Sequence, residues 1–376
     1  MYISGIGRTK FGVNKGPIHR MIYSAMCDVL NDSNKSINNI DAIIVSNFLG
    51  GPLQGQLHNN ALIASLLPGI NLPIYHNETA CASGGAAFNQ ALHLLNKYEN
   101  VMIVGFEKMN GTTKIPPIEA LTMAEDFELG YEKGLIFPAA YALIAQMYLD
   151  KYSVNHEILE MISYNNHINA NLNPNAQFYE KNVTMDMIKQ AKMVSSPLTL
   201  FDCSPLSDGA VAVIISNNKV SDRDVKILSS ELITDSISIV QRKDLTSFPA
   251  TKIAARKAFE YAHIKPQDID ILEVHDCFTI SELIALEDLG ICAAGKAHEL
   301  IKNEDITLKG SIPVNTDGGL KANGHPIGAT GLAQIFEIVT QLRKEAGRRQ
   351  VESCEIGVCQ NIGGIGSTSV VSVLGV

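Results

Sequence analysis

Residues 76–92 read HNETACASGGAAFNQAL, and this stretch places a single cysteine where a strand gives way to a helix. The preceding LPIYHNET has the apolar and aromatic content of a strand, and the following ASGGAAFNQALHLLN has the content of a helix. Cys81 is therefore predicted to lie at a strand-to-helix turn. The residues after it are small enough for another backbone or a ligand to approach closely: Ala82, Ser83, Gly84 and Gly85.

A second Gly-rich turn that opens a helix occurs later, as GHPIGATGLAQI (324–335). Upstream of the two turns, NNIDAIIVSNF (38–48) and PQDIDILEVHDCF (266–278) both run from Ile-Asp into an apolar strand. These pairs indicate a duplicated chain with a boundary near residue 218, which gives halves at 1–218 and 219–376. The alternative is chance, because α/β strands share a composition.

Strands and helices alternate along the chain, which predicts an α/β protein. Helices are expected, for example, at 250–263 and 331–347. The expected strands are rich in Val and Ile and bounded by Gly, Asn or Asp, at 41–48, 101–106, 209–216, 270–278, 355–360 and 368–374.

The first half carries an insertion. About 100 residues (107–206) separate its last two expected strands, whereas a few residues separate the last two of the second half. We expect this block to form a mostly helical, loop-rich subdomain over one face, because long inserts in α/β folds usually cover or build a site.

Composition excludes several classes of function. The 376 residues are 46% hydrophobic and 18% charged, with a net charge of -9, which argues against nucleic acid as a main partner. No apolar run approaches the ~20 residues of a membrane helix, and the start does not read as a signal peptide, so a cytoplasmic protein is expected. The seven cysteines show no CxxC spacing and are expected to be free thiols.

Cys81 has two readings. It is either a small buried cysteine, or a nucleophile whose thiolate is favoured by the positive end of the following helix. The segment VHDCF (274–278) also has two interpretations. His275, Asp276 and Cys277 either form a site at the end of a buried strand, where α/β sheets place ligands, or form a polar turn beside a core Phe278. No second cluster has metal-ligand spacing, so no metal site is predicted.

Two more glycine-rich stretches complete the candidate site. In NTDGGLKANGHPIGATG (315–331), His325 is either a functional imidazole or a helix-cap residue, and the stretch has neither a GxGxxG nor a Walker A pattern. CQNIGGIGS (359–367) is expected to be a glycine hairpin whose backbone N–H groups line a site. A cysteine nucleophile needs a base and an oxyanion site, and two thiols with two imidazoles meet that need.

These motifs resemble the thiolase family over essentially the whole chain. The "HDCF" at 275–278 replaces the Asn-Glu-Ala-Phe of ordinary thiolases, which is similar to the sterol-carrier-protein-linked thiolases and the archaeal acetyl-CoA acetyltransferases. The usual C-terminal Cys-x-Gly departs here, because Asn361 stands where the second cysteine is expected and Cys359 lies two residues earlier. The matching motifs are GRTKFG (7–12), ETACASGGAAF (78–88), SPLSDGAVAV (204–213) and NTDGGLKANGHPIGATG (315–331).

The resemblance implies a fold of two βαβαβαββ halves in five layers, α/β/α/β/α, plus the inserted loop domain. It implies roles for four side chains: Cys81 as nucleophile, His325 as its base and an oxyanion donor, Cys277 as acid/base for the α-proton, and His275 as an oxyanion donor. It also implies substrate-binding positions at Ser83, Gly324, Gly363 and Gly364.

The resemblance further implies an acyl-CoA C-acyltransferase that condenses two acetyl-CoA to acetoacetyl-CoA plus CoA, or runs the reverse thiolysis of 3-ketoacyl-CoA. CoA thioesters are substrates and no permanent cofactor is expected. The expected partners are a second copy, as a homodimer or dimer of dimers, and 3-hydroxy-3-methylglutaryl-CoA synthase held through a small bridging protein. The alternatives are a condensing enzyme with a non-CoA acceptor, and a thiolase-like subunit that acts mainly within a larger complex.

Overall fold

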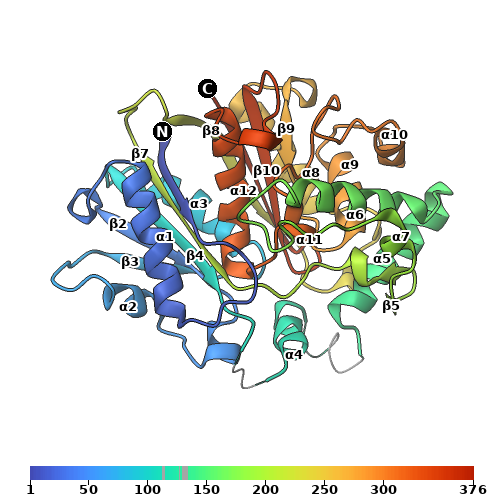
Figure 1. Ribbon diagram of the computed structural model, residues 1–376, viewed down its shortest axis with the longest axis horizontal. Helices are drawn as coiled ribbons and strands as arrows, with labels where there is room; N and C mark the ends of the chain where they lie inside the picture. The colour runs from blue at the N-terminus through green and yellow to red at the C-terminus, as the bar shows by residue number, and fades with distance from the viewer. Residues whose placement is uncertain (112–114, 127, 129–133) are drawn as a thin grey trace.

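The computed structural model describes residues 1–111, 115–126, 128 and 134–376 (Figure 1). In this part of the chain, nine strands form one sheet in the order β3-β2-β4-β7-β1-β8-β11-β10-β9. The first half supplies β1 (Tyr2–Arg8), β2 (Ala42–Ser46), β3 (Ile74–Asn77), β4 (Asn100–Glu107) and β7 (Gly209–Ser216). The second half supplies β8 (Val225–Thr234), β9 (Ile271–Glu273), β10 (Ile356–Gly363) and β11 (Thr368–Gly375).

The strand order is mirrored about the β1–β8 junction, where Tyr2 pairs with Lys226 and Ile3 with Val225. In the first half β3, β2 and β4 run parallel to one another. Next, β7 pairs antiparallel with β4, and β1 pairs antiparallel with β7. In the second half β9 and β10 run parallel, and β11 and β8 are added antiparallel. The counterpart of β3 is reduced to one bridge between Leu272 and Val314. This repeated pattern confirms the duplicated α/β architecture, while the boundary near residue 218, between β7 and β8, stays a prediction.

Helices cover and separate the two halves of the sheet. On the outside, α1 (Ile18–Asp32) packs on β1 and β7, and α8 (Pro249–Ala262) packs on β8 and β11. Between the halves, α3 (Ser83–Leu94) and α12 (Ile327–Leu342) contact each other and strands of both halves. Figure 1 shows α12 running between the blue-to-cyan first half and the orange-to-red second half. Helices and sheet halves therefore alternate as α/β/α/β/α, which are the five layers predicted.

Glycines bring α3 and α12 into backbone contact. A Cβ added to Gly84 would lie 2.9 Å from the Gly331 nitrogen, and one added to Gly331 would lie 2.2 Å from the Gly85 nitrogen. Side chains at these positions would force the helices apart. Because Cys81 precedes α3 and His325 precedes α12, this close approach also sets how far apart those two residues lie.

The described residues of the inserted block form helices joined by long loops, and most of the regular secondary structure there is helical. It contains α4 (Pro117–Leu121), α5 (Phe137–Tyr152), α6 (Glu157–Ala170) and α7 (Met185–Lys189), followed by a small hairpin of β5 (Met193–Ser195) and β6 (Leu198–Thr199). It lies against the second half, where α6 contacts α9 (Thr279–Asp288), α10 (Ala297–Lys302) and α11 (Gly319–Ala322) (Figure 1, green). The first half also has α2 (Asn59–Ala64). No described helix is long and apolar enough to cross a membrane.

Among the strand boundaries that differ from the expectation, two affect the glycine-rich and HDCF segments. The strand expected over 270–278 ends at Glu273, because Val274 donates its N–H to Asn315 Oδ1 at 2.8 Å and the chain leaves the sheet. The expected glycine hairpin at 359–367 is shorter, because β10 continues to Gly363 and pairs there with Thr368. The HDCF residues therefore lie in the loop between β9 and α9.

Candidate active site

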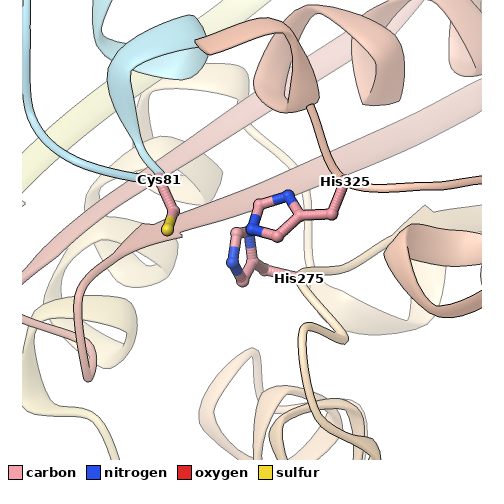
Figure 2. A group of neighbouring side chains, drawn as sticks. All are labelled: Cys81, His275 and His325. Atoms are coloured by element: carbon pink, nitrogen blue, oxygen red, sulfur yellow. The ribbon is translucent and has the colours of Figure 1, made fainter. Parts of the chain in front are cut away.

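Three side chains from three different elements meet at the centre of the molecule. Cys81 comes from the turn before α3, His275 from the loop after β9 and His325 from the turn before α12 (Figure 2). Their sulfur and ring-nitrogen atoms lie within 4.8 Å of one another. The two imidazole rings are 5.2 Å apart and nearly perpendicular, at 87°. The structure thus brings together three of the four side chains expected to be catalytic.

Cys277, the fourth, faces the same space from another side. A cavity of about 220 Å³ is lined by residues that include Cys81, Cys277, His325 and Gly364, whereas His275 is fully buried and is not among the lining residues. Its other walls are mainly apolar and include Met109, Leu121, Phe137, Phe278 and Ile327. Three cysteines, Cys81, Cys203 and Cys277, and the His325 imidazole therefore line one mostly apolar chamber, which strengthens electrostatic interactions with a bound substrate. The Cys203 thiol already donates to the Thr199 carbonyl at 3.3 Å.

The turn at Cys81 is held by Ser83. The Thr79 N–H donates to Ser83 Oγ at 2.9 Å, and that hydroxyl donates to the Ala80 carbonyl at 2.6 Å. The backbone of Ala80 has φ +51, a left-handed conformation that residues other than glycine rarely adopt. Ser83 itself is fully buried and does not line the cavity, so its expected role in substrate binding stays a prediction.

The glycine positions have different surroundings. Gly364 lines the cavity, and its N–H hydrogen-bonds to Cys81, which lowers the pKa of that thiol. The Gly364 carbonyl accepts the Tyr141 hydroxyl at 3.1 Å. Gly363 packs on the Cys81 turn, since an added Cβ would lie 2.4 Å from the Thr79 oxygen. Gly324, with φ +115, forms the turn before His325 and is not part of the lining.

Burial keeps the resting side chains neutral. It lowers the pKa of His325 to about 3 and that of His275 well below its usual value. It raises the pKa of Cys81 far above that of a free thiol. The expectation that the helix start favours the Cys81 thiolate is therefore outweighed by burial, and the thiolate has to form as a neighbouring base takes the proton.

The two candidates for the second thiol differ in placement. Cys277 lines the cavity, lies 3.8 Å from Ser281 Oγ and is in hydrogen-bond contact with the Tyr141 hydroxyl. Burial raises the pKa of Cys277 to about 12, and these hydroxyls act in the opposite direction. Cys359 lies inside β10 between Glu273 and Ser372, away from the cavity. Burial raises its pKa far above the usual range.

Comparison with known proteins identifies the family. The family model described as "Thiolase, N-terminal domain" matches residues 1–219, and the one described as "Thiolase C-terminal domain-like" matches residues 232–376. The chain belongs to the thiolase family. Thiolases are acyltransferases whose substrates are CoA thioesters, and this protein is an enzyme of that class.

Relatives of this thiolase span its whole length. It is 40% identical to an acetyl-CoA acetyltransferase of Methanothermobacter thermautotrophicus, over 99% of this chain and 98% of that protein. It is 32% identical to sterol carrier protein 2 of Bos taurus, over 99% of this chain and 72% of that protein. A solved structure described as an "Ltp2-ChsH2(DUF35) aldolase" matches with a TM-score of 0.87 at 20% identity, over 100% of this chain and 97% of that one. These relatives confirm the expected HDCF-type subgroup.

Sequence reasoning missed several residues that hold this thiolase site together. Asn361 hydrogen-bonds to both the Cys81 backbone and the His275 ring, although its identity had suggested only that the second cysteine was absent. Asn166 of α6 donates to Asp276 at 2.9 Å and to Glu282 at 2.7 Å, which ties the insertion to the HDCF loop. Tyr141 links the same insertion to Gly364. Only Asn361 carried a sequence signal, its place in the expected Cys-x-Gly motif.

Proposed function

We propose that this thiolase is an acetyl-CoA C-acetyltransferase, which condenses two acetyl-CoA to acetoacetyl-CoA plus CoA and also runs the reverse thiolysis. The observation that carries the proposal is the single cavity into which Cys81, Cys277 and His325 all open. A condensation through an acyl-enzyme needs a nucleophile, its base and a second group for the α-proton, and this cavity offers one side chain for each. The name of the archaeal relative supports the acetyl substrate.

In the first half-reaction, His325 takes the Cys81 proton as the sulfur attacks the thioester carbonyl carbon. The oxyanion that forms is stabilised by the backbone N–H groups of Gly364 and Cys81. The tetrahedral intermediate collapses and breaks the carbon–sulfur bond to CoA. The leaving thiolate takes the proton from His325, so CoA departs as the thiol and the acetyl group remains on Cys81.

In the second half-reaction, Cys277 gives its proton to the neutral His325 and, as the thiolate, removes a proton from the methyl group of a second acetyl-CoA. The negative charge moves onto the thioester oxygen, and the role assigned to His275 is to donate an N–H to that oxygen. The carbanion attacks the acetyl carbonyl on Cys81, a carbon–carbon bond forms, and Cys81 leaves as a thiolate. Cys277 keeps the α-proton as its thiol, the proton held by His325 passes to Cys81, and the starting state is restored.

Thiolysis assays test the proposal directly. The purified chain is incubated with acetoacetyl-CoA and free CoA, and acetyl-CoA is measured, followed by a series of longer 3-ketoacyl-CoA substrates. We expect turnover that is fastest for the four-carbon substrate. Turnover only with a non-CoA acyl acceptor would favour the alternative condensing enzyme. Activity that appears only after adding a partner protein would favour a subunit of a larger complex.

We also propose a homodimer or dimer of dimers in the cytoplasm. In support, β3 lies at the end of the sheet order, and the described residues place no strand on its outer edge. An open edge strand pairs readily with a second copy of itself. A complex with 3-hydroxy-3-methylglutaryl-CoA synthase through a small bridging protein is a further proposal, supported by the solved thiolase-fold structure whose description includes a DUF35 component. Light scattering of the purified chain tests the first, and an active monomer would contradict it.

A further inference from the structure

We propose that Asn361 and Thr330 hold His275 and His325 in opposite tautomers, so that one ring offers an N–H donor and the other a lone pair at the same site. The inference rests on the proposed function for the catalytic use of each ring. The tautomers themselves follow from hydrogen bonds and can be measured without any assay of activity.

The orientation of the Asn361 carboxamide is fixed by two backbone groups. The Gly85 N–H, which can only donate, lies 3.1 Å from Asn361 Oδ1. The Cys81 carbonyl, which can only accept, lies 3.1 Å from Asn361 Nδ2. The oxygen and the nitrogen of this amide therefore cannot be exchanged without breaking both hydrogen bonds.

This orientation sets the tautomer of His275. Asn361 Nδ2 also lies 3.1 Å from His275 Nδ1, and an amide nitrogen carries two hydrogens and no acceptor. One hydrogen goes to the Cys81 carbonyl, so the other is donated to His275 Nδ1. That ring nitrogen must present a lone pair, and in the neutral imidazole the proton then sits on Nε2.

The Nε2–H group of His275 has no hydrogen-bond partner among the described residues, although the side chain is fully buried. An unpaired buried donor is energetically costly, so we expect a bound group to complete it. The complementary group is an oxygen that becomes negative during the reaction. The same tautomer leaves Nε2 without a lone pair, which argues against reading the Cys81, His275 and His325 cluster as a metal site.

Thr330 gives His325 the opposite arrangement. The Thr330 hydroxyl donates at 3.2 Å to the carbonyl of Pro326, the N-cap residue that precedes α12. The hydroxyl of Thr330 has only one hydrogen, and this hydrogen bond uses it. The Thr330 oxygen, 2.7 Å from His325 Nδ1, therefore accepts a hydrogen from that ring nitrogen. His325 Nδ1 carries the proton and Nε2 keeps its lone pair, which is the form that a base for Cys81 requires. Both residues are positioning residues, because each acts through a neighbouring imidazole.

Nitrogen NMR of the full-length protein labelled with ¹⁵N-histidine tests the tautomers directly. His275 and His325 signals are assigned from the spectra of the His275→Gln and His325→Gln variants. We expect His275 to be protonated at Nε2 and His325 at Nδ1 near neutral pH. The same tautomer in both rings, or the reverse pair, overturns the proposal. A protein without thiolase activity but with the expected tautomers would refute the proposed function alone.

Variants of Asn361 and Thr330 test the two imidazoles separately. In Asn361→Asp a carboxylate replaces the donor, so His275 moves its proton to Nδ1, and condensation should fall by about 10²–10³-fold while acylation of Cys81 by acetyl-CoA continues. In Thr330→Val the loss should instead fall on acylation, by about 10²–10⁴-fold. Asn361→Ala, in which His275 should populate both tautomers, replaces the Asp variant if that one does not fold.

The matched control is Asn89→Asp, which removes an amide donor from α3 to the Ser230 carbonyl of the other half without touching either imidazole. It should keep both rates and both tautomers. Equal losses in both half-reactions for Asn361→Asp and Thr330→Val, with unchanged NMR signals, would assign these residues a merely structural role and overturn the inference.

Discussion

Cys81 and Cys277 open into the same cavity from opposite halves of the duplicated fold. One thiol follows β3 and the other follows β9, so their meeting depends on the packing between the halves rather than on any local motif. A shared cavity does not by itself say which thiol is acylated. The surroundings of the two sulfurs give different expectations for each.

Cys81 should be the thiol that carries the acyl group. The Gly364 N–H faces its sulfur, and His325 lies within the same 4.8 Å cluster. Incubation with acetyl-CoA, acid quench, digestion and mass spectrometry should locate a single acetyl group on Cys81, and Cys81→Ala should show none. An acetyl group on Cys277 with Cys81 unmodified would reverse the two assignments.

Cys277→Ala should block condensation but not acylation. The variant loses the group for the α-proton, so the condensation rate should fall by about 10²–10⁴-fold, whereas Cys81 should still take up acetyl from acetyl-CoA. Cys359→Ala is the matched control, because that thiol is buried in β10 and should leave most of the activity intact. If the Cys359 variant is the one that loses condensation, the role assigned to Cys277 is wrong.

His167 should make the protein sensitive to acid. The ring lies edge-on between Phe178 and Phe201, and neither ring nitrogen has a hydrogen-bond partner in the described part of the chain. Burial lowers the pKa of His167 to about 3, below the value of about 6.5 in the unfolded chain, so the unfolded state binds the proton first. Stability from this residue is present above the unfolded pKa and is lost as the pH falls from about 6.5 towards 3.

Urea unfolding at several pH values measures this effect. As the pH falls from about 6 to about 4, the free energy of unfolding of the wild type should decrease more steeply than that of His167→Phe. The two slopes should differ by about 1.4 kcal/mol per pH unit. The exposed His19→Phe serves as a control and should follow the wild-type slope. Parallel slopes for all three proteins would mean that His167 is protonated in the folded state.

Gly331→Ala should destabilise the protein and impair catalysis together. The added Cβ would lie 2.2 Å from the Gly85 nitrogen, so α3 and α12 must separate. Overpacking of this kind costs about 1–3 kcal/mol, which exceeds the gain of up to about 1 kcal/mol from replacing glycine inside a helix. Because these helices follow Cys81 and His325, acylation should also slow. Gly16→Ala, at a position with a single neighbour, should be near neutral in both measurements.

The sequence was sufficient for the architecture but not for all its strands. β1 was missed because Gly5 and Gly7 replace the usual Val and Ile, and the structure shows why: an added Cβ on Gly7 would lie 2.4 Å from the Val29 nitrogen of α1. β8 was missed because serines interrupt its apolar run, yet Ser229 is used to donate to the Ala258 carbonyl of α8 at 2.7 Å. In both strands, contact with a helix overrides strand propensity.

Motifs predicted which residues carry the candidate chemistry, but not the contacts that orient them. For Asn166 the sequence predicted only that it belongs to the inserted block, whereas the structure buries it in α6, where its amide bridges Asp276 and Glu282. Asn166 and Asp276 are 110 residues apart along the chain. Periodicity and local composition report neighbours along a helix or strand, so pairings across this distance leave no trace in one sequence.

The mirrored strand order has an evolutionary consequence. Each half contributes one Gly-rich helix start to the centre, and the two starts have diverged: one kept a thiol at Cys81 and the other an imidazole at His325. A single-half ancestor would have needed a second copy to place two helix starts side by side, and both starts would then have been identical. Within one polypeptide that constraint is absent, because the two equivalent positions are encoded separately and can differ, one as a thiol and the other as an imidazole.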